Sequence, residues 1–420
     1  MMNIYRPTVK FIMLPELLPF TTVALALRQH FTSGDVCSPS LLQLSPSEQN
    51  RLEVCRSPGQ DNFSPVFATN SSSPWTSQSD CRNNTETFCA FSSSSFAGGR
   101  GISILTTPGR IESLQQLAAF ADADALSGVN EQLSPAFEEK ELPGRGRGLI
   151  ANKTLHRGDR IFAHTPILML DGESFGDLEK EQWLELEHAA VNNLPLKTRT
   201  MFSALYGRPV TDPVSDRIDT NAFVLELNEV TYYAVFPETA RLNHDCRPNA
   251  AYFFDKQTLT HYVHAITDIT PGTEITITYV DPHMPRQKRL KKLSSLWGFD
   301  CSCSLCSLHP ELAHASDERL DQITTINDRL EDWESAPLQM AQTLISLYEQ
   351  ERLHAPAGSA YWYAALMSCT HGLYWETIRY AQLAIELGLL DYGFEDESFH
   401  RMRQLAKEPA EDECWLARLK

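Results

Sequence analysis

The sequence is poor in positive charge and in long apolar runs. Its 420 residues include 36 lysines and arginines against 54 aspartates and glutamates, which gives a formal net charge of −18. The imbalance is largest in residues 310–420, which hold 9 basic and 20 acidic side chains. Such a chain does not bind nucleic acid through its bulk charge. After residue 27, no run is long and apolar enough to span a bilayer.

The sequence also lacks a nucleotide-binding fingerprint. Pro143–Leu149 is a glycine-dense turn, but neither a P-loop lysine nor a βαβ pattern follows it. Because glycine lets the backbone approach a ligand closely, the turn remains a candidate for binding a carboxylate or a sulfonium as well as a phosphate. Arg145 and Arg147 either offer charge to a carboxylate or lie on the surface of the loop.

Residues 1–27 resemble a secretory signal peptide, because two basic residues precede an apolar run that ends in the small-residue pattern Ala24-Leu25-Ala26. Three glycosylation sequons follow, which begin at Asn62, Asn70 and Asn83. The alternative is a poorly ordered extension on an intracellular protein. Both interpretations stay open at this point.

Residues 28–135 are rich in serine and asparagine and show little hydrophobic periodicity over most of their length. We expect a low-complexity region that is partly disordered, with a short strand at 102–105 and a helix at 111–120. Six of the cysteines lie outside the middle of the chain. Disulfides among the four N-terminal ones could stabilise a small part of this region. The six are Cys37, Cys55, Cys81 and Cys89, with Cys369 and Cys414 standing alone near the C-terminus.

Short strand-like runs separated by turn residues dominate the middle of the chain. They are Ala222–Leu227, Thr231–Phe236, Ala251–Phe254, Thr260–Ile266 and Glu274–Val280, preceded by expected helices at Asp177–Asn192 and Leu196–Tyr206. Many short strands without long alternating helices exclude a doubly wound parallel sheet. After residue 310, helical periodicity predicts an all-α region. Its expected helices are 317–333, 338–352, 360–369, 373–387 and 398–407.

Cys301, Cys303 and Cys306 lie within six residues, a spacing that suits one tetrahedral zinc ion. Packing alone rarely explains three thiols this close together. A closed site needs a fourth ligand, and Cys246 is the nearest candidate in the expected core. Because four sulfur ligands leave no open coordination position, we expect the zinc to be structural.

Five basic residues lie within seven positions just before this cysteine cluster. They are Arg286, Lys288, Arg289, Lys291 and Lys292. A solvated helix face is the favoured interpretation, and contact with an anionic partner is the alternative. Together with the cysteines, these bases would also fit a zinc-ribbon nucleic-acid binder, an interpretation that the overall acidity opposes.

Four motifs occur in an order that resembles the SET-domain protein-lysine methyltransferases. They are the turn Arg145–Leu149, the segment Arg241–Asn249 in place of the family's Arg-x-x-Asn-His-Ser-Cys-x-Pro-Asn, the strand Glu274–Tyr279, and the post-SET Cys-x-Cys-x-x-Cys at 301–306. The layout is most similar to the SET and MYND group, but residues 171–220 contain no cysteine and so no MYND zinc finger. The resemblance implies an α+β fold. Its expected parts are a SET-domain β-clip of several short sheets with a helical insert over 136–284, a post-SET zinc element over 285–309 and a helical C-terminal domain over 310–420.

The resemblance also implies roles for individual residues. The structural zinc would be held by Cys246, Cys301, Cys303 and Cys306. The cofactor S-adenosylmethionine would lie against Arg145, Gly146, Arg147, Gly148, Asn221, Asn243, His244, Tyr279 and Phe299. Tyr279 corresponds to the catalytic tyrosine, Phe299 would lie beside the adenine, and Pro248-Asn249 would complete a threaded crossing. Two departures from the family are Asp245, where serine is usual, and Trp297, where relatives have a second tyrosine.

The implied reaction is methyl transfer to a lysine of a protein substrate, histone or non-histone. A lysine ammonium, with a pKa near 10.4, must lose its proton before it attacks, and a desolvated aromatic channel favours the neutral amine. The alternative is a catalytically weak or inactive SET-fold interaction protein, which Asp245 and Trp297 suggest. We expect a monomer that does not bind nucleic acid directly. The family points to the nucleus or cytoplasm, whereas residues 1–27 and the sequons point to the secretory pathway.

Overall fold

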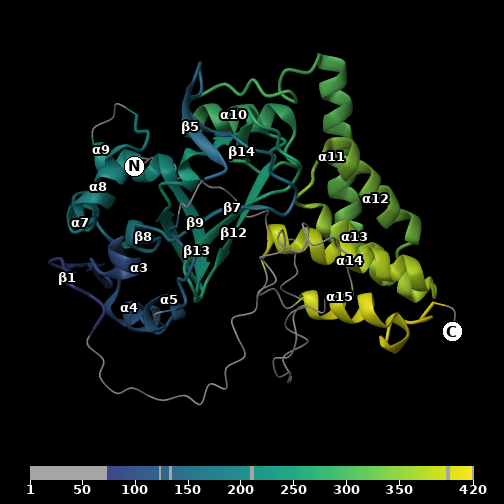
Figure 1. Cartoon of the computed structure of the whole chain (residues 1–420), viewed down its shortest axis with the longest axis horizontal. Helices are drawn as coiled ribbons and strands as arrows, with labels where there is room; N and C mark the ends of the chain where they lie inside the picture. The colour runs from purple at the N-terminus through teal and green to yellow at the C-terminus, as the bar shows by residue number, and fades with distance from the viewer. Residues whose placement is uncertain (1–72, 123, 132–134, 209–211, 394–397, 419–420) are drawn as a thin grey trace.

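The structure is a computed structural model that describes residues 73–418 apart from 123, 132–134, 209–211 and 394–397. The expected signal peptide, the first two sequons and two of the N-terminal cysteines therefore lie outside the described residues. A sheet-rich end, a centre of smaller sheets and a C-terminal group of helices follow one another across the molecule (Figure 1).

The elements are short and numerous. The strands are β1 Ser77–Gln78, β2 Arg82–Asn83, β3 Thr87–Ser93, β4 Ile102–Thr106, β5 Phe137–Leu142, β6 Gly146–Ala151, β7 Arg160–His164, β8 Leu168–Asp171, β9 Ala222–Leu227, β10 Val230–Val235, β11 Asn243–His244, β12 Ala250–Asp255, β13 Thr260–Ala265 and β14 Glu274–Ile277. The helices are α3 Phe96–Gly99, α4 Pro108–Leu114, α5 Ala118–Ala121, α6 Ser174–Asp177, α7 Lys180–Asn192, α8 Leu196–Ser203, α9 Pro213–Asn221, α10 Arg286–Trp297, α11 Pro310–Leu330, α12 Leu338–Glu351, α13 Ala357–Thr370, α14 Tyr374–Asp391 and α15 Ser398–Lys407, with 3₁₀ turns η2 Thr239–Arg241 and η3 Pro409–Glu411.

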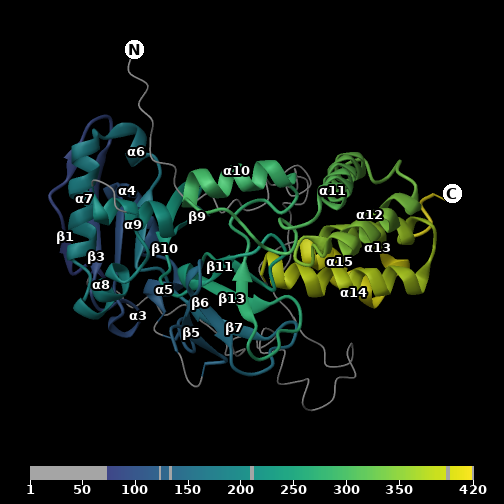
Figure 2. The ribbon, with the colours of Figure 1, turned by 90° about the horizontal axis from the view of Figure 1, so that it is seen from above.

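The largest sheet has the strand order β1-β3-β4-β8-β10-β9, with β2 paired to β3. Its strands β4 and β8 are parallel and are buried along their whole length, as expected for strands covered on both faces. Helix α7 packs on β3 and β4 through Trp183, Leu186 and Ala190. Figure 2 shows this sheet at one end of the molecule and the C-terminal helices at the other.

The described part of the region 28–135, which was expected to be of low complexity and partly disordered, contains regular strands and helices. Strand β3 is buried from Phe88 to Ser93, and the hydroxyl groups of Ser92 and Ser103 share a hydrogen bond of 2.7 Å between β3 and β4. A serine-rich strand covered on both faces lacks the alternation that marks a half-buried strand. The boundary predicted at residue 135 therefore runs through one sheet.

Two smaller sheets confirm the expected class of fold. Their strand orders are β11-β14-β6-β5 and β12-β13-β7. The five strands expected between residues 222 and 280 are all present, with ends that differ by at most a few residues. Helix α9 was not expected. Asp212 begins it by accepting hydrogen bonds from the amides of Val214 and Ser215, and Pro213 fits its first turn.

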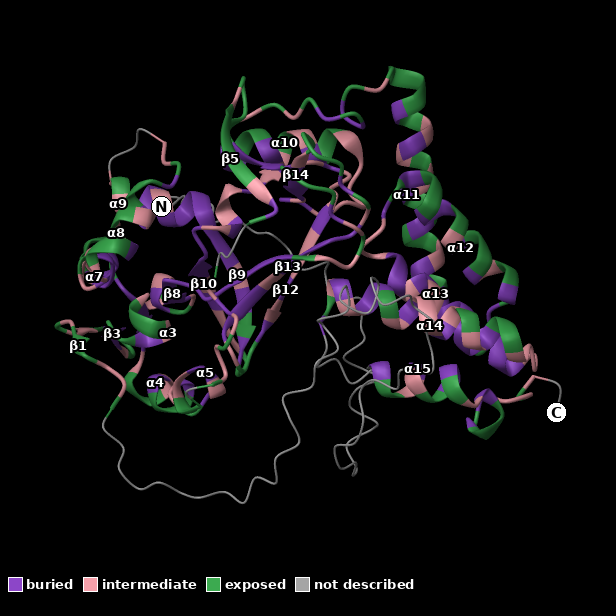
Figure 3. Ribbon diagram, viewed as in Figure 1, coloured by how far each residue is buried: buried purple, intermediate pink, exposed green. Residues whose placement is uncertain are grey.

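The five helices α11–α15 confirm the expected all-α C-terminal region, and in Figure 3 they turn buried faces toward one another and exposed faces outward. Helix α11 begins at Pro310, earlier than expected, because proline suits the first turn of a helix. Two cysteines expected to stand alone, Cys369 and Cys414, are joined in a disulfide, as are Cys81 and Cys89. None of the described helices combines the length and the apolarity that a membrane crossing requires.

The centre of the fold buries histidine rings without charge partners. His261 on β13 is fully buried and stacks on Phe236, with ring centroids 3.7 Å apart. Neither of its ring nitrogens has a hydrogen-bond partner among the described residues. Burial lowers its pKa well below the usual 6.5, and burial likewise lowers the pKa of His264 to about 3.

This burial predicts acid sensitivity. The unfolded chain takes up a proton at His261 as the pH falls below about 6.5 and the folded chain does not, so stability that is present above pH 6.5 is lost below it. At pH 5.5 the loss is about 1.4 kcal/mol for one such histidine. Urea unfolding of wild type and His261→Phe at pH 7.5 and 5.5 measures this, because the variant is expected to lose less stability by that amount. Equal losses would mean that the ring titrates normally in the folded protein.

Candidate functional site

A cavity of about 560 Å³ lies where four segments of the fold meet. Its wall comes from the turn before β6, the end of α9, the segment Ala240–His244, and the segment that follows α10. Most of the predicted cofactor residues line it, namely Arg145, Gly146, Arg147, Asn221, Asn243, His244, Tyr279 and Phe299, whereas Gly148 lies just behind the wall. Its volume is in the range of small-molecule sites.

The loop Leu242–Asn249 crosses the centre of this site. Its strand β11 pairs in parallel with β14, matching Asn243 to Thr276. The side chain of Asn249 fixes the end of the loop, because its amide nitrogen donates to the Glu274 carbonyl at 2.8 Å and its oxygen accepts from the Thr276 amide at 2.9 Å. Several contacts therefore hold the loop against β14.

Glu274 orients two predicted cofactor residues, although it was predicted only as part of a strand motif. Its carboxylate accepts a hydrogen bond from the Asn243 side chain at 2.8 Å and pairs with Arg145 at 3.2 Å. Arg145 also donates to the main-chain carbonyl of His244 at 2.9 Å. The guanidinium and the amide are thus held in place before any ligand binds.

Arg147 lines the cavity, and Gly148 lies directly behind the wall. The Arg147 guanidinium turns outward to Glu139 and Glu141, while its carbonyl accepts from Asn243 at 3.2 Å. A Cβ on Gly148 would lie 2.8 Å from the Asn243 amide and 2.8 Å from a Glu274 oxygen. Only glycine leaves the contact between Asn243 and Glu274 undisturbed at this point.

Helix α9 supplies two polar groups from the other side. Both amide hydrogens of Asn221 are used, by the carbonyls of Tyr206 and Arg217, each at 2.8 Å, so its side-chain oxygen is the polar atom that remains. The buried hydroxyl of Thr220 has no hydrogen-bond partner among the described residues. Thr220 was missed by the sequence analysis, because no motif marks α9.

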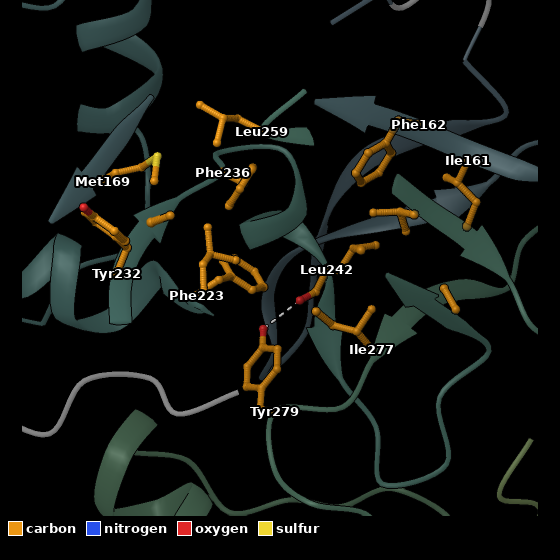
Figure 4. Close-up of a cluster of buried hydrophobic side chains, with 14 of the residues drawn as sticks. Ile161, Phe162, Met169, Phe223, Tyr232, Phe236, Leu242, Leu259, Ile277 and Tyr279 are labelled. Carbon is orange, nitrogen blue, oxygen red and sulfur yellow. Dashed lines mark hydrogen bonds between the residues drawn. The ribbon is translucent and has the colours of Figure 1, made fainter. Parts of the chain in front are cut away.

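Tyr279 is held at both ends by the loop. Its hydroxyl donates to the Leu242 carbonyl at 2.7 Å, as Figure 4 shows, and its main-chain amide donates to Nδ1 of His244 at 3.0 Å. Burial, and then the charge of Glu274, raise the pKa of the phenol. It therefore stays protonated at neutral pH and cannot act as a base, but its oxygen keeps lone pairs that can accept a hydrogen bond.

Aromatic rings enclose Tyr279. Trp297, at the end of α10, packs against it with ring centroids 5.3 Å apart, and Phe299 lies at 6.4 Å. Gly298, which lies between Trp297 and Phe299 in the sequence, ends α10 in the left-handed conformation with a φ of 73°. This part of the wall is apolar and disfavours a charged amine.

The four predicted zinc ligands form one cluster, to which the loop Leu242–Asn249 contributes Cys246. The sulfur atoms of Cys246, Cys301, Cys303 and Cys306 all lie within 4.8 Å of one another. Zn–S bonds of about 2.3 Å in a tetrahedron separate sulfurs by a little under 4 Å, so the arrangement fits one zinc ion. The clustering of the four residues is as predicted, and zinc itself stays a prediction.

The interpretation of five bases on a solvated helix face is wrong for Arg289. This residue is almost fully buried and lies beside Cys246 and Cys306, where the thiolates raise its pKa against the effect of burial. Its positive charge offsets part of the negative charge of four thiolates. Of the other four bases, Lys288 and Lys291 are exposed, and Arg286 and Lys292 are half-buried.

Asp245 does not line the cavity. Its carboxylate accepts a hydrogen bond from the Arg247 amide at 2.8 Å. Burial raises the pKa of Asp245 to about 6. The carboxylate thus caps a turn of the loop next to Arg247.

Arg247 ties the loop to the C-terminal helices. Its guanidinium pairs with Glu351 at the end of α12 at 2.7 Å, and both side chains are almost completely buried. Arg319 of α11 pairs with the same carboxylate at 2.7 Å. Arg247 also donates to the Cys246 carbonyl at 2.7 Å. The C-terminal helices are therefore connected to a predicted zinc ligand.

Comparison with known proteins gives one family model, the SET domain, which matches residues 146–280. The chain is 30% identical over 197 residues to histone-lysine N-methyltransferase set5 of Schizosaccharomyces pombe, covering 46% of this chain and 58% of the relative. It is 29% identical over 136 residues to N-lysine methyltransferase SMYD2 of Homo sapiens, covering 31% of this chain and 29% of the relative. The chain thus spans less than two thirds of the length of either relative.

Gly148 gives a direct test of this wall. Gly148→Ala would push a methyl group between Asn243 and Glu274, so we expect binding of S-adenosylmethionine to weaken by about tenfold or more, because an oriented amide is displaced. Isothermal titration calorimetry measures the change. Gly109→Ala is the matched control, since nothing lies within 4 Å of a Cβ there. Equal affinity in both variants would contradict the assignment of this wall to the cofactor.

Proposed function

We propose that this chain, whose residues 146–280 match the SET-domain family and which is similar to lysine methyltransferases, transfers a methyl group from S-adenosylmethionine to a lysine side chain of a protein substrate. One observation carries the proposal: Tyr279, Asn243 and Arg145 line a single cavity and are each held there by other residues. Bound S-adenosylmethionine supplies a sulfonium methyl group that a neutral amine can attack.

The chain's own residues divide the work of binding. Arg145 offers a guanidinium to the carboxylate of the methyl donor, and the side-chain oxygen of Asn221 and the Thr220 hydroxyl offer polar contacts from α9. Phe299 offers an aromatic face to the adenine. Glu274 keeps Arg145 and Asn243 in position, so that little side-chain freedom is lost on binding.

Tyr279 is proposed to align the amine. Its proton is directed to the Leu242 carbonyl, which leaves the phenol oxygen as an acceptor for an N–H of the incoming lysine. The rings of Trp297 and Phe299 disfavour the ammonium form, so the proton leaves for solvent before the amine attacks. Most of the acceleration then comes from alignment of donor and acceptor rather than from acid–base catalysis.

Four thiolates from Cys246, Cys301, Cys303 and Cys306 would hold a zinc ion that supplies folding free energy to the wall near Phe299. The substrate lysine is proposed to belong to a histone or to another protein, in line with the names of the two relatives. Asp245 and Trp297 suggested the alternative of an inactive interaction protein. Asp245 no longer favours it, because this residue does not line the cavity.

Tyr279→Phe tests the reaction. With tritiated S-adenosylmethionine and a panel of histones and lysine peptides, we expect wild type to label protein. The variant should be slower by about a hundredfold, because the amine loses its alignment. Tyr380→Phe in α14 is the control, since it removes a phenol hydroxyl that does not line the cavity.

Donor binding without transfer to any substrate would favour the inactive alternative. Equal rates for wild type and Tyr279→Phe would remove Tyr279 from the mechanism.

A further inference from the structure

His244 lies between the predicted zinc ligands and the predicted catalytic tyrosine. One ring nitrogen, Nδ1, is 3.0 Å from the main-chain nitrogen of Tyr279, and the other, Nε2, is 3.3 Å from the sulfur of Cys246. The residue is 3% exposed, so water does not replace these contacts. Both ring nitrogens are therefore occupied by protein groups.

The contacts fix the position of the ring proton. A main-chain amide can only donate, so Nδ1 of His244 must accept the hydrogen bond from Tyr279. In the neutral ring the proton then sits on Nε2 and points at the Cys246 sulfur. A thiolate bound to a metal is a good acceptor for this N–H. One tautomer satisfies both neighbours at once.

We infer that His244 is a positioning residue that couples the zinc site to Tyr279, rather than a side-chain ligand of the cofactor, an inference whose catalytic meaning rests on the proposed function. The imidazole supports Cys246 as an outer-shell donor and holds the amide of Tyr279. The Leu242 carbonyl holds the hydroxyl of the same tyrosine. Zinc, imidazole and phenol thus form one chain of contacts within a single loop.

Two substitutions separate the two hydrogen bonds of the His244 ring. Asparagine places a side-chain oxygen near the position of Nδ1, so His244→Asn keeps an acceptor for the Tyr279 amide but loses the donor to sulfur. Glutamine places an amide nitrogen near the position of Nε2, so His244→Gln keeps the donor to sulfur but loses the acceptor. Each variant is the control for the other. His156→Asn, at a half-buried histidine that does not line the cavity, controls for loss of an imidazole as such.

Two readouts need no methyltransferase activity. Competition with a chromogenic chelator measures zinc affinity, and hydrogen exchange followed by mass spectrometry measures protection of the Tyr279 amide. For His244→Asn we expect zinc affinity to fall about 10- to 100-fold, the usual effect of losing an outer-shell partner, with Tyr279 still protected. For His244→Gln we expect zinc affinity to be kept and Tyr279 exchange to speed up about tenfold.

A third readout connects the coupling to the reaction. Because the ring does not reach the cofactor through a free nitrogen, His244→Gln should lower kcat while leaving the affinity for S-adenosylhomocysteine unchanged. A loss of S-adenosylhomocysteine affinity equal to the loss of kcat would overturn the positioning role and make His244 a cofactor ligand.

The outcomes separate this coupling from the proposed function. If the two variants split zinc affinity and amide protection as expected while no substrate is methylated, the coupling stands and the methyltransferase proposal fails. If both variants lose both properties to the same extent, or neither variant changes either property, the ring acts only as packing and the coupling is wrong, whatever the enzyme does.

Discussion

The crossing of Leu242–Asn249 over β14 is the constraint on which the rest of the site depends. Eight consecutive residues supply a parallel strand pair, an acceptor for the Tyr279 hydroxyl, a predicted zinc ligand and an amide side chain that closes the loop on β14. A loop this short cannot relax around one of these contacts without moving the others. The cavity wall, the thiolate cluster and the tyrosine are therefore parts of one rigid unit rather than neighbours.

The C-terminal helices belong to this unit through a buried ion pair. Arg247 and Glu351 are 2% to 3% exposed, and Glu351 also accepts from Arg319 and from the Ser316 hydroxyl. Loss of one partner from such a pair typically costs about 3–5 kcal/mol, because it leaves a buried charge uncompensated. The acidic residues of 310–420 are thus not all on the solvated surface, since the buried carboxylate of Glu351 compensates the charge of Arg247 in the loop.

Local patterns predicted which residues lie together but not the contacts that support them. The cysteine spacing, the order of motifs and the short strands were visible in sequence. The structure brings residues of the motifs together around one cavity and the four cysteines into one cluster. The supporting contacts join residues far apart in the chain, such as Arg145 with Glu274 and Arg247 with Glu351, and no local pattern encodes them. Strand β3 was missed for a different reason: its serines bond inside the sheet, so composition indicated a loop where the fold has a core.

The central claim is that the cavity beside Tyr279 binds the methyl donor. A crystal structure of the protein with S-adenosylhomocysteine tests it most directly. The account predicts the ligand between Arg145 and Asn243, with its adenine against Phe299 and its sulfur facing the Tyr279 hydroxyl. A ligand bound elsewhere, or a cavity that stays without it at saturating concentration, would contradict the account.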